Sequence, residues 1–170
     1  MSKKKLGLFL GRFQPFHQGH LFLIDYIFKE NDEVVICIGS AQKAEPLTIS
    51  ERHERLEKQL DILGFEREKY RIVDLVDPNV MGIWPKYVKD LCGITDETDN
   101  TFYRGDDIPD NYRKDLEGLG FKVEIIKRIA FYHCAPNGIY YVVSSATEIR
   151  SLNEKFGDCS KNKSKIKRTE

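Results

Sequence analysis

The sequence predicts an α/β fold in which five parallel strands form one doubly wound sheet. Short apolar runs rich in β-branched residues alternate along the chain with longer segments of helical periodicity. The runs are almost continuously apolar, which is typical of strands that helices cover on both faces; a sheet with one face in solvent would show alternation instead. Alternating strands and helices joined by right-handed crossovers give a doubly wound sheet.

Each predicted strand is an apolar run that ends at a turn-forming residue. The first run ends at Gly11, and the third ends at the break Asp77-Pro78-Asn79. The predicted strands cover residues 5–10, 33–39, 70–76, 101–104 and 121–126. In such sheets ligands bind beyond the carboxyl ends of the strands, where the strand order reverses.

The predicted helices follow from apolar spacing and from capping residues. Leu21 and Ile24 belong to an apolar stripe of helical spacing, so the first helix begins near Gln18. Thr48 and Glu51 form a capping-box pattern that opens the second helix. The predicted helices after the first cover residues 48–63, 83–92, 110–119 and 145–156.

An aromatic segment over residues 131–143 lies outside this alternation. It surrounds Asn137-Gly138, a dipeptide typical of a hairpin turn, and we therefore expect a small antiparallel β-hairpin here. The segment could serve as a lid, as an oligomer contact or as an additional piece of core. We expect residues 1–159 to form a single domain, and the polar, basic residues 160–170 to form a disordered tail.

The composition excludes some classes of function. The 170 residues carry no formal net charge, which argues against a protein that binds nucleic acid mainly through phosphate contacts, although a local basic pocket remains compatible with it. No apolar stretch approaches the length that spans a bilayer. The four cysteines are scattered without zinc-type spacing, and Cys37 lies in an apolar run as a core residue would. We expect a cytoplasmic protein with no nucleic-acid or membrane partner.

A first motif lies between the first predicted strand and the first predicted helix, where residues 11–20 read GRFQPFHQGH. His17 and His20 are three residues apart at the helix start, so both can face one side. A helix N-terminus has free N–H groups and a positive potential, which attract anions. Two imidazoles and the guanidinium of Arg12 suit phosphate oxygens. The alternative is a polar loop with a capping histidine.

Three further residues of the first motif shape its loop. We expect Gly11 to allow a tight turn, Pro15 to stiffen the loop, and Gly19 to let a ligand approach the backbone. The complete string favours a phosphate site far more strongly than a single histidine would.

A second motif, Ser145-Ala146-Thr147-Glu148-Ile149-Arg150, opens the last predicted helix. Hydroxyl and backbone donors at a helix start can bind an anion, and the arginine one turn later can reach back to a phosphate. The alternative is an ordinary capping box followed by a surface arginine.

Both motifs resemble signatures of one enzyme superfamily. HQGH resembles the H-x-G-H signature of nucleotidylyltransferases, and GRFQPFHQGH resembles the archaeal-type nicotinamide-nucleotide adenylyltransferases in particular. Residues 145–150 resemble the S-x-T-x-I-R signature, with Ala146 where the archaeal form has glycine. The resemblance covers roughly residues 5–156 and implies a Rossmann-like nucleotidyltransferase fold.

The resemblance also implies a reaction. The 5′-phosphate of NMN attacks the α-phosphorus of ATP in line, and NAD and pyrophosphate form without a covalent enzyme intermediate. Mg²⁺ enters with ATP and is held mostly by water and substrate oxygens, so no protein metal ligands are expected. Family members often form homo-oligomers.

The implied catalytic residues are Arg12, His17, His20 and Arg150. The implied residues that bind ATP and its phosphates are Gly11, Phe13, Gln14, Pro15, Gly19, Gly105, Asp107, Ser145 and Thr147.

The implied NMN-binding residues are Gly39, Ser40, Gln42, Arg52 and Trp84. Small residues after the second strand leave room for a ligand, and a tryptophan face can stack on a cationic nicotinamide ring. Structural alternatives are a plain strand-end loop, a solvated arginine at position 52 and a packing role for the tryptophan. Gly105-Asp106-Asp107 departs from the archaeal Gly-Asn pattern, although a carboxylate there could accept hydrogen bonds from ribose hydroxyls or the adenine amino group.

Other functions remain open at the level of sequence. The acceptor could be another phosphomonoester, namely nicotinate mononucleotide, FMN or pantetheine phosphate, although Trp84 and residues 39–42 favour NMN. A non-catalytic nucleotide sensor need not keep His17, His20 and Arg150 together. A relative of class I tRNA synthetases would need a tRNA-binding domain and positive charge, and this chain is short and neutral.

Overall fold

The computed structural model describes residues 2–43, 46–77, 83–105, 108–127, 129–135 and 137–156. Three sequence predictions fall outside this range: the tail over residues 160–170, the Pro78-Asn79 part of the third strand's break, and the candidate site residue Asp107.

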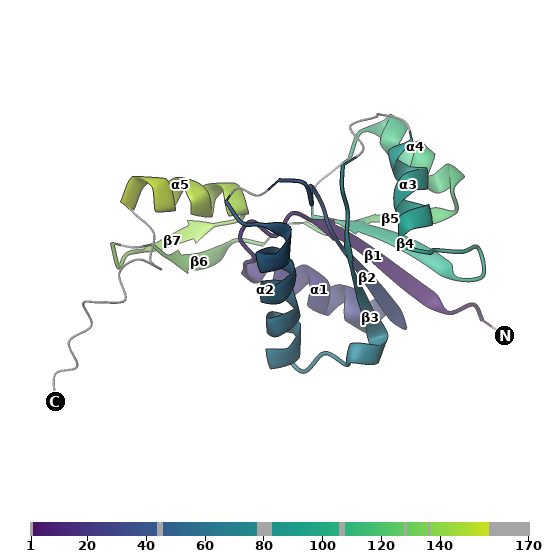
Figure 1. The fold of residues 1–170 in the computed structure, drawn as a ribbon, viewed down its shortest axis with the longest axis horizontal. Helices are drawn as coiled ribbons and strands as arrows, with labels where there is room; N and C mark the ends of the chain where they lie inside the picture. The colour runs from purple at the N-terminus through teal and green to yellow at the C-terminus, as the bar shows by residue number, and fades with distance from the viewer. Residues whose placement is uncertain are drawn as a thin grey trace.

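Five parallel strands form the central sheet (Figure 1), in the order β3-β2-β1-β4-β5. β1 lies in the middle and pairs with β2 on one side and β4 on the other, so the strand order reverses beside it. This arrangement is the doubly wound sheet that the sequence predicts. The strands are β1 (Lys5–Gly11), β2 (Glu33–Ile38), β3 (Tyr70–Asp74), β4 (Asp99–Arg104) and β5 (Phe121–Ile125).

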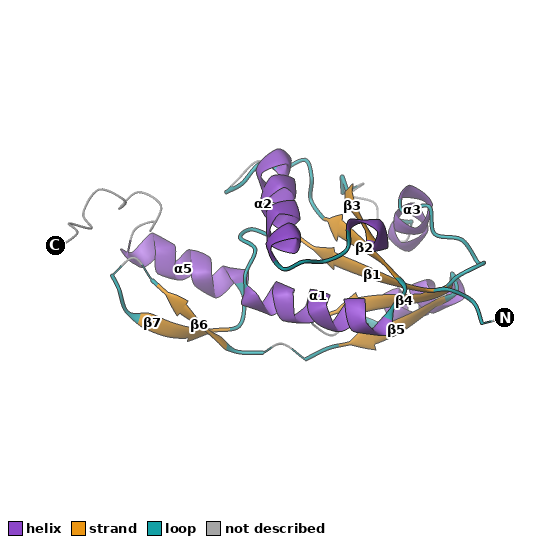
Figure 2. Ribbon diagram, turned by 90° about the horizontal axis from the view of Figure 1, so that it is seen from below, coloured by secondary structure: helices purple, strands orange, loops and turns teal. Residues whose placement is uncertain are grey.

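Helices cover both faces of the sheet (Figures 1 and 2). One face packs against α1 (Gln18–Glu30) and α2 (Ile49–Ile62), and the other against α3 (Trp84–Leu91) and α4 (Asp110–Gly118). A short 3-10 helix, η1 (Arg67–Lys69), precedes β3. Of the helices in the described ranges, none is long and apolar enough to cross a membrane.

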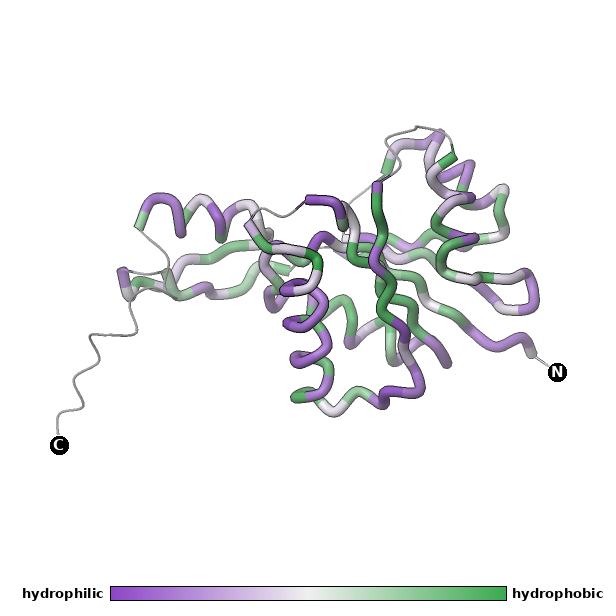
Figure 3. Tube along the Cα trace, in the orientation of Figure 1, coloured by the Kyte–Doolittle hydropathy of each residue, from purple (hydrophilic) through white to green (hydrophobic). Residues whose placement is uncertain are grey.

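The core is divided between these two faces. Side chains of successive strand residues point to opposite sides, so Leu8 packs toward α3 and α4 while its neighbour Phe9 packs toward α1. Hydrophobic residues are concentrated along the strands (Figure 3), whereas hydrophobic and hydrophilic residues alternate along the helices. This distribution explains why the strands read as continuous apolar runs and the helices as periodic ones.

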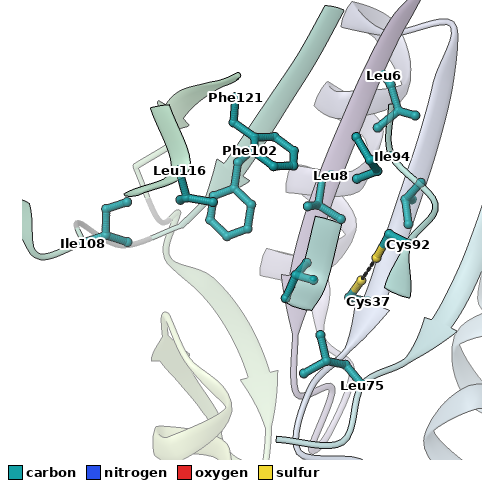
Figure 4. Close-up of a cluster of buried hydrophobic side chains, with 12 residues drawn as sticks. Leu6, Leu8, Cys37, Leu75, Cys92, Ile94, Phe102, Ile108, Leu116 and Phe121 are labelled. Carbon is teal, nitrogen blue, oxygen red and sulfur yellow. Dashed lines mark hydrogen bonds between the residues drawn. The ribbon is translucent and has the colours of Figure 1, made fainter. Parts of the chain in front are cut away.

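Cys37 and Cys92 meet inside the core beneath α3 (Figure 4). Both are fully buried free thiols, and their Sγ atoms are 3.0 Å apart. The hydrogen bond with Cys92, together with burial, raises the pKa of the Cys37 thiol. Cys37 is therefore a small core residue that stays protonated, as its apolar surroundings in the sequence predict.

Two strand boundaries differ from prediction by two residues, and three others differ by one residue. β3 ends at Asp74. Leu75 donates its N–H to Ile38, the last residue of β2, and its carbonyl accepts the N–H of Ala41 in the loop beyond β2. β4 begins two residues early, at Asp99, although its first residues are polar. The side-chain amide of Asn100 is buried, but its nitrogen donates to the carbonyl of Thr95 and its oxygen accepts from the Thr98 hydroxyl. Both polar atoms of this amide therefore have a hydrogen-bond partner.

The aromatic segment forms the predicted antiparallel hairpin, β6 (Phe131–Cys134) and β7 (Tyr140–Val143). Gly138, at the turn, has a φ of +80°. The last helix, α5 (Ala146–Phe156), packs on one hairpin face, where Phe131, Val143 and Ile149 make a small core of their own. Hairpin and helix lie beyond one end of the sheet (Figures 1 and 2).

Candidate active site

A pocket of about 450 Å³ lies beyond the carboxyl ends of the central strands. Leu10, Gly39, Leu75 and Arg104 line it from the ends of four neighbouring strands, and Ile126 lines it from just after β5. Further lining residues come from the loop before α1, the start of α1, the start of α3, and the segment that leads into and begins α5. This is the place where open α/β sheets bind ligands, because the strand order reverses between β1 and β4.

The lining of the pocket is strongly cationic within a chain of zero net charge. Arg12, Arg104, Lys127 and Arg150 line it, and Asp77 is the one carboxylate among the described lining residues. The pocket is therefore suited to a ligand that carries several negative charges. Sequence reasoning missed Arg104 and Lys127, although each follows immediately after the apolar part of a strand, at the sheet edge where ligands bind.

The two motif histidines cap α1 and line the pocket at the same time. His17 is the N-cap, and its Nδ1 accepts the backbone N–H of His20 at 3.3 Å. The Nδ1 of His20 accepts the backbone N–H of His17 at 3.3 Å in return. With both Nδ1 atoms accepting, the hydrogen of each neutral ring resides on Nε2, which becomes the donor atom. The rings stack with centroids 3.7 Å apart.

The side chains of Phe13 and Gln14 serve the loop itself. The Phe13 ring is 1% exposed and packs between Phe9, Phe16 and the ring of His20. The Gln14 amide donates to the carbonyl of Leu47 at 3.0 Å. Both residues line the pocket, but these contacts commit their side chains to holding the motif in place.

The structure corrects the reasons given for two glycines. Gly11 makes no left-handed turn; a Cβ there would lie 2.8 Å from the Phe13 ring, so the glycine makes room for that ring. A Cβ on Gly19 would lie 3.0 Å from ring atoms of His17 and 3.3 Å from Phe131. Gly19 thus makes room for the histidine and for the hairpin, not for a ligand alone. Pro15 is not among the lining residues.

The second motif joins the first across the pocket. Ser145, Thr147 and Arg150 all line it. Arg150 donates through Nη1 to the carbonyl of Gln14, 136 residues earlier in the chain, and through Nη2 to the Thr147 hydroxyl at 3.0 Å. The Phe131 ring stacks on His17 with centroids 5.2 Å apart. The hairpin and α5 therefore complete the site that the first motif begins.

A capping box also forms at the start of α5, as the alternative interpretation of this motif predicts. The backbone N–H groups of Ser144 and Ser145 donate to Glu148 Oε2 at 2.5 and 3.1 Å. Glu148 N–H donates to the Ser145 hydroxyl at 3.3 Å. Capping and pocket lining are thus compatible functions of Ser145.

The Glu148 cap makes the stability of α5 depend on pH. Hydrogen bonds from the backbone N–H of Ser144, and then from its hydroxyl and from Ser145, hold the pKa of Glu148 below its ordinary value of 4.5. A depressed pKa in the folded state means that the stabilisation is complete above pH 4.5 and is lost as the pH falls through the folded-state value. We expect Glu148→Gln to lower the melting temperature at pH 7 and the difference to shrink in acid. A difference independent of pH, measured by thermal denaturation, would contradict this account.

Trp84 lines the opposite side of the pocket, together with Gly39 and Ser40. It is the first residue of α3, and the ring of Tyr112 from α4 supports it with centroids 5.3 Å apart. Gly105 also lines the pocket. Gln42 does not: its side-chain oxygen accepts the backbone N–H of Asp77 at 3.0 Å.

The structure corrects the prediction for Arg52. This side chain is fully buried, lies behind the pocket wall, and is absent from the lining. Its guanidinium donates to backbone carbonyls, so it is neither the solvated helix residue nor the direct ligand contact that the sequence left open.

The described residues offer few side chains that could bind a metal ion together. They contain no group of three or more His, Cys, Asp or Glu side chains able to hold a metal ion. With Asp77 as the sole described carboxylate in the pocket, a divalent cation would need most of its oxygen ligands from a bound nucleotide and water.

Comparison with known proteins shows which family the chain resembles and which curated proteins it matches. Residues 8–152 match the family model described as cytidylyltransferase-like. A nicotinamide-nucleotide adenylyltransferase from Thermococcus sibiricus is 51% identical over 87 residues, which are 49% of this chain and 47% of that protein. The Pyrococcus furiosus enzyme of the same name is 44% identical over 92 residues, 51% of this chain and 49% of its own length. The chain spans about half the length of these curated relatives.

Solved structures share the fold. A bifunctional NMN adenylyltransferase/ADP ribose pyrophosphatase from Francisella tularensis has a TM-score of 0.67 at 20% identity, covering 87% of this chain and 41% of that chain. A structure of this bifunctional protein complexed with AMP and a manganese ion has a TM-score of 0.63 at 22% identity, with the same coverage. The fold prediction and the resemblance noted from the motifs are both confirmed.

Proposed function

The chain belongs to the cytidylyltransferase-like family, and from this premise we propose that it transfers the AMP group of ATP to NMN, which yields NAD and pyrophosphate. The observation that carries the proposal is the meeting of both motifs in one cationic pocket. His17, His20 and Arg12 come from one end of the chain, and Arg150 comes from the other.

The charge of the pocket supports a reaction between two phosphate-bearing substrates. A phosphate oxygen of NMN attacks the α-phosphorus of ATP, the bond from that phosphorus to the α–β bridging oxygen breaks, and pyrophosphate leaves. The attacking phosphate is already an anion, so no strong base is needed. Catalysis then consists of positioning the reactants and stabilising the charge on the transferred group.

The histidines are proposed to stabilise that transferred group. Because Nδ1 of each ring accepts a backbone N–H, the ring hydrogen is on Nε2, and Nε2–H is the proposed donor to α-phosphate oxygens. The stacked rings hold the two donors in one orientation, which is what a preorganised transition-state site requires.

The leaving pyrophosphate is proposed to bind between Arg12 and the start of α5. Ser145, Thr147 and Arg150 line that side of the pocket, and a helix N-terminus favours anions. A divalent cation, Mg²⁺ in this proposal, would supply further neutralisation of phosphate charge while bound to the nucleotide oxygens. Manganese accompanies AMP in the Francisella tularensis structure, which supports the use of a divalent ion.

NMN is the proposed acceptor because of Trp84 and the names of the relatives. The Trp84 ring lines the pocket and is held in place by Tyr112, so it can present a face to a cationic nicotinamide ring. The curated relatives at 44% and 51% identity are nicotinamide-nucleotide adenylyltransferases.

The decisive experiment offers ATP and Mg²⁺ with NMN, nicotinate mononucleotide, FMN or phosphopantetheine, each in a separate reaction. Pyrophosphate release and NAD are both measured. Rapid pyrophosphate release with NMN, matched by NAD, is the expected result. Preferential reaction with another acceptor would refute NMN while keeping the chemistry, and binding of ATP without any transfer would favour a nucleotide sensor.

We also propose that the protein is a homo-oligomer that associates through the hairpin. Tyr132, Tyr140 and Val142 on its outer face are 69%, 67% and 62% exposed. Tyr132 and Val142 are directly paired across the strands, so they form one apolar strip. Light scattering that finds only monomers, with the Tyr140→Ser variant behaving identically, would refute this.

A further inference from the structure

Arg52 uses every hydrogen-bond donor that an arginine side chain has. It lies on α2 and is fully buried. An arginine carries five side-chain N–H donors, and each of them here meets a backbone carbonyl oxygen. The bonds are Nε to Thr48 at 3.3 Å, Nη1 to Arg12 at 3.2 Å and Gly39 at 2.8 Å, and Nη2 to Ser40 and Lys43, each at 3.0 Å.

Carbonyl dipoles, and not a carboxylate, stabilise the buried charge. Burial lowers the pKa of Arg52, and Asp74 opposes that shift only through its charge at a distance, without a hydrogen bond. Lysine could not replace this arrangement, because an ammonium has three donors and lacks the planar fork that reaches carbonyls in different directions.

Four of the five carbonyls belong to the segments that build two walls of the pocket, and the fifth is that of Thr48, the N-cap of α2. The carbonyl of Arg12 lies in the first motif, immediately after β1. Those of Gly39, Ser40 and Lys43 lie in the loop after β2, and Gly39 also donates its N–H to Gly11 at 2.8 Å.

Ser40 has an unfavourable backbone conformation within the loop after β2. Its φ is +53°, a left-handed value that is unfavourable for a residue with a side chain. It lines the pocket, as its neighbour Gly39 does. The bond from Arg52 to the Ser40 carbonyl therefore holds a strained part of the wall in position.

We propose that Arg52 is a positioning residue that fixes the spacing between the phosphate-binding motif and the loop after β2, without touching either substrate. The inference rests on the proposed function. In this proposal the planar fork of the guanidinium, and not its charge, aligns the acceptor with the α-phosphate.

The test compares Arg52→Lys with Arg55→Lys. Arg55 is a matched control, because it lies three residues further along α2 and its side chain is exposed. Both variants keep the positive charge and the helix. We expect Arg52→Lys to lower kcat/KM for NAD formation about tenfold or more, through kcat as well as the KM for NMN, because misaligned reactants lose rate. Arg55→Lys should match the wild type.

Hydrogen exchange of the backbone amides provides a readout that does not depend on activity. In Arg52→Lys, faster exchange is expected in peptides that cover residues 39–43 and the first motif, with no change in the peptides of β6, β7 and α5. Unchanged exchange at residues 39–43, or kcat/KM within twofold of the wild type, would overturn the proposal.

A second variant separates geometry from charge. Arg52→Ala leaves a space that ethylguanidinium can fill, and we expect this additive to restore part of the lost rate while ethylammonium does not. Equal rescue by both cations would overturn the role of the fork; if Arg52→Ala does not fold, the exchange data on Arg52→Lys decide. A wild-type protein that makes no NAD would refute the proposed function, and the exchange experiment would still test the positioning of the loops.

Discussion

His20→Asn is expected to lower kcat for NAD formation by about 100-fold to 1,000-fold, the usual cost of losing one donor to a developing charge. The asparagine side chain places an oxygen where Nδ1 of His20 lies, so it can still accept the backbone N–H of His17. It removes the Nε2–H donor together with the ring that packs against His17, Phe13 and Phe16. Steady-state kinetics with NMN and ATP should show the loss of kcat, and the melting temperature should fall only modestly, because the ring packing is lost while the cap is kept.

His20→Gln is the complementary variant. Its amide reaches the position of Nε2 but cannot cap the helix, so the loss of the reciprocal cap should cost about 1 kcal/mol of stability. It should retain far more activity than His20→Asn. The reverse order of activities would mean that the ring at position 20 acts through the cap alone.

Trp84→Ala is expected to raise the KM for NMN by about 10-fold to 100-fold, because stacking of an aromatic side chain on a base contributes about 1–3 kcal/mol. The KM for ATP should change little. Trp84→Phe keeps an aromatic face against Tyr112 and should remain within about threefold of the wild type.

The same series tests the choice of acceptor. If the KM values for ATP and NMN rise together in Trp84→Ala, the ring only supports the wall of the pocket. Thermal denaturation of each variant distinguishes that case from a general loss of packing, since Trp84 also contacts the core cluster beneath α3 and α4.

The fold was predictable because its local signals agree with one another. The continuous apolar runs of β1 and β2 are buried on both faces, and Thr48 with Glu51 forms the capping box that the sequence predicts. Strand boundaries were less predictable. The polar start of β4 is paired in the sheet because Thr95 and Thr98 satisfy the Asn100 amide, a tertiary detail that no periodicity reveals.

The candidate site divides in a similar way. The two motifs were identifiable as strings, and the structure brings His17, His20, Thr147 and Arg150 to one pocket. Arg104 and Lys127 are single charges that follow the apolar part of a strand, and this position alone does not distinguish a ligand-binding residue from a solvated one.

Arg52 did leave a sequence signal. It lies at the same helical spacing as Leu56 and Leu60, the buried residues of α2, so an arginine occupies a core position of the helix. Its partners are backbone carbonyls, which any residue supplies, and the sequence therefore could not identify them.

The stacking of Phe131 on His17 has a consequence for heat inactivation. The hairpin and α5 share a core of three buried residues, whereas each face of the sheet has a cluster of twelve among the described residues. A segment with so little buried apolar surface opens at a lower free energy than the sheet it leans on. Each opening withdraws Arg150, Thr147 and the ring that holds His17. We therefore expect activity to disappear on warming before the sheet melts, and to return on cooling as soon as β6, β7 and α5 dock again.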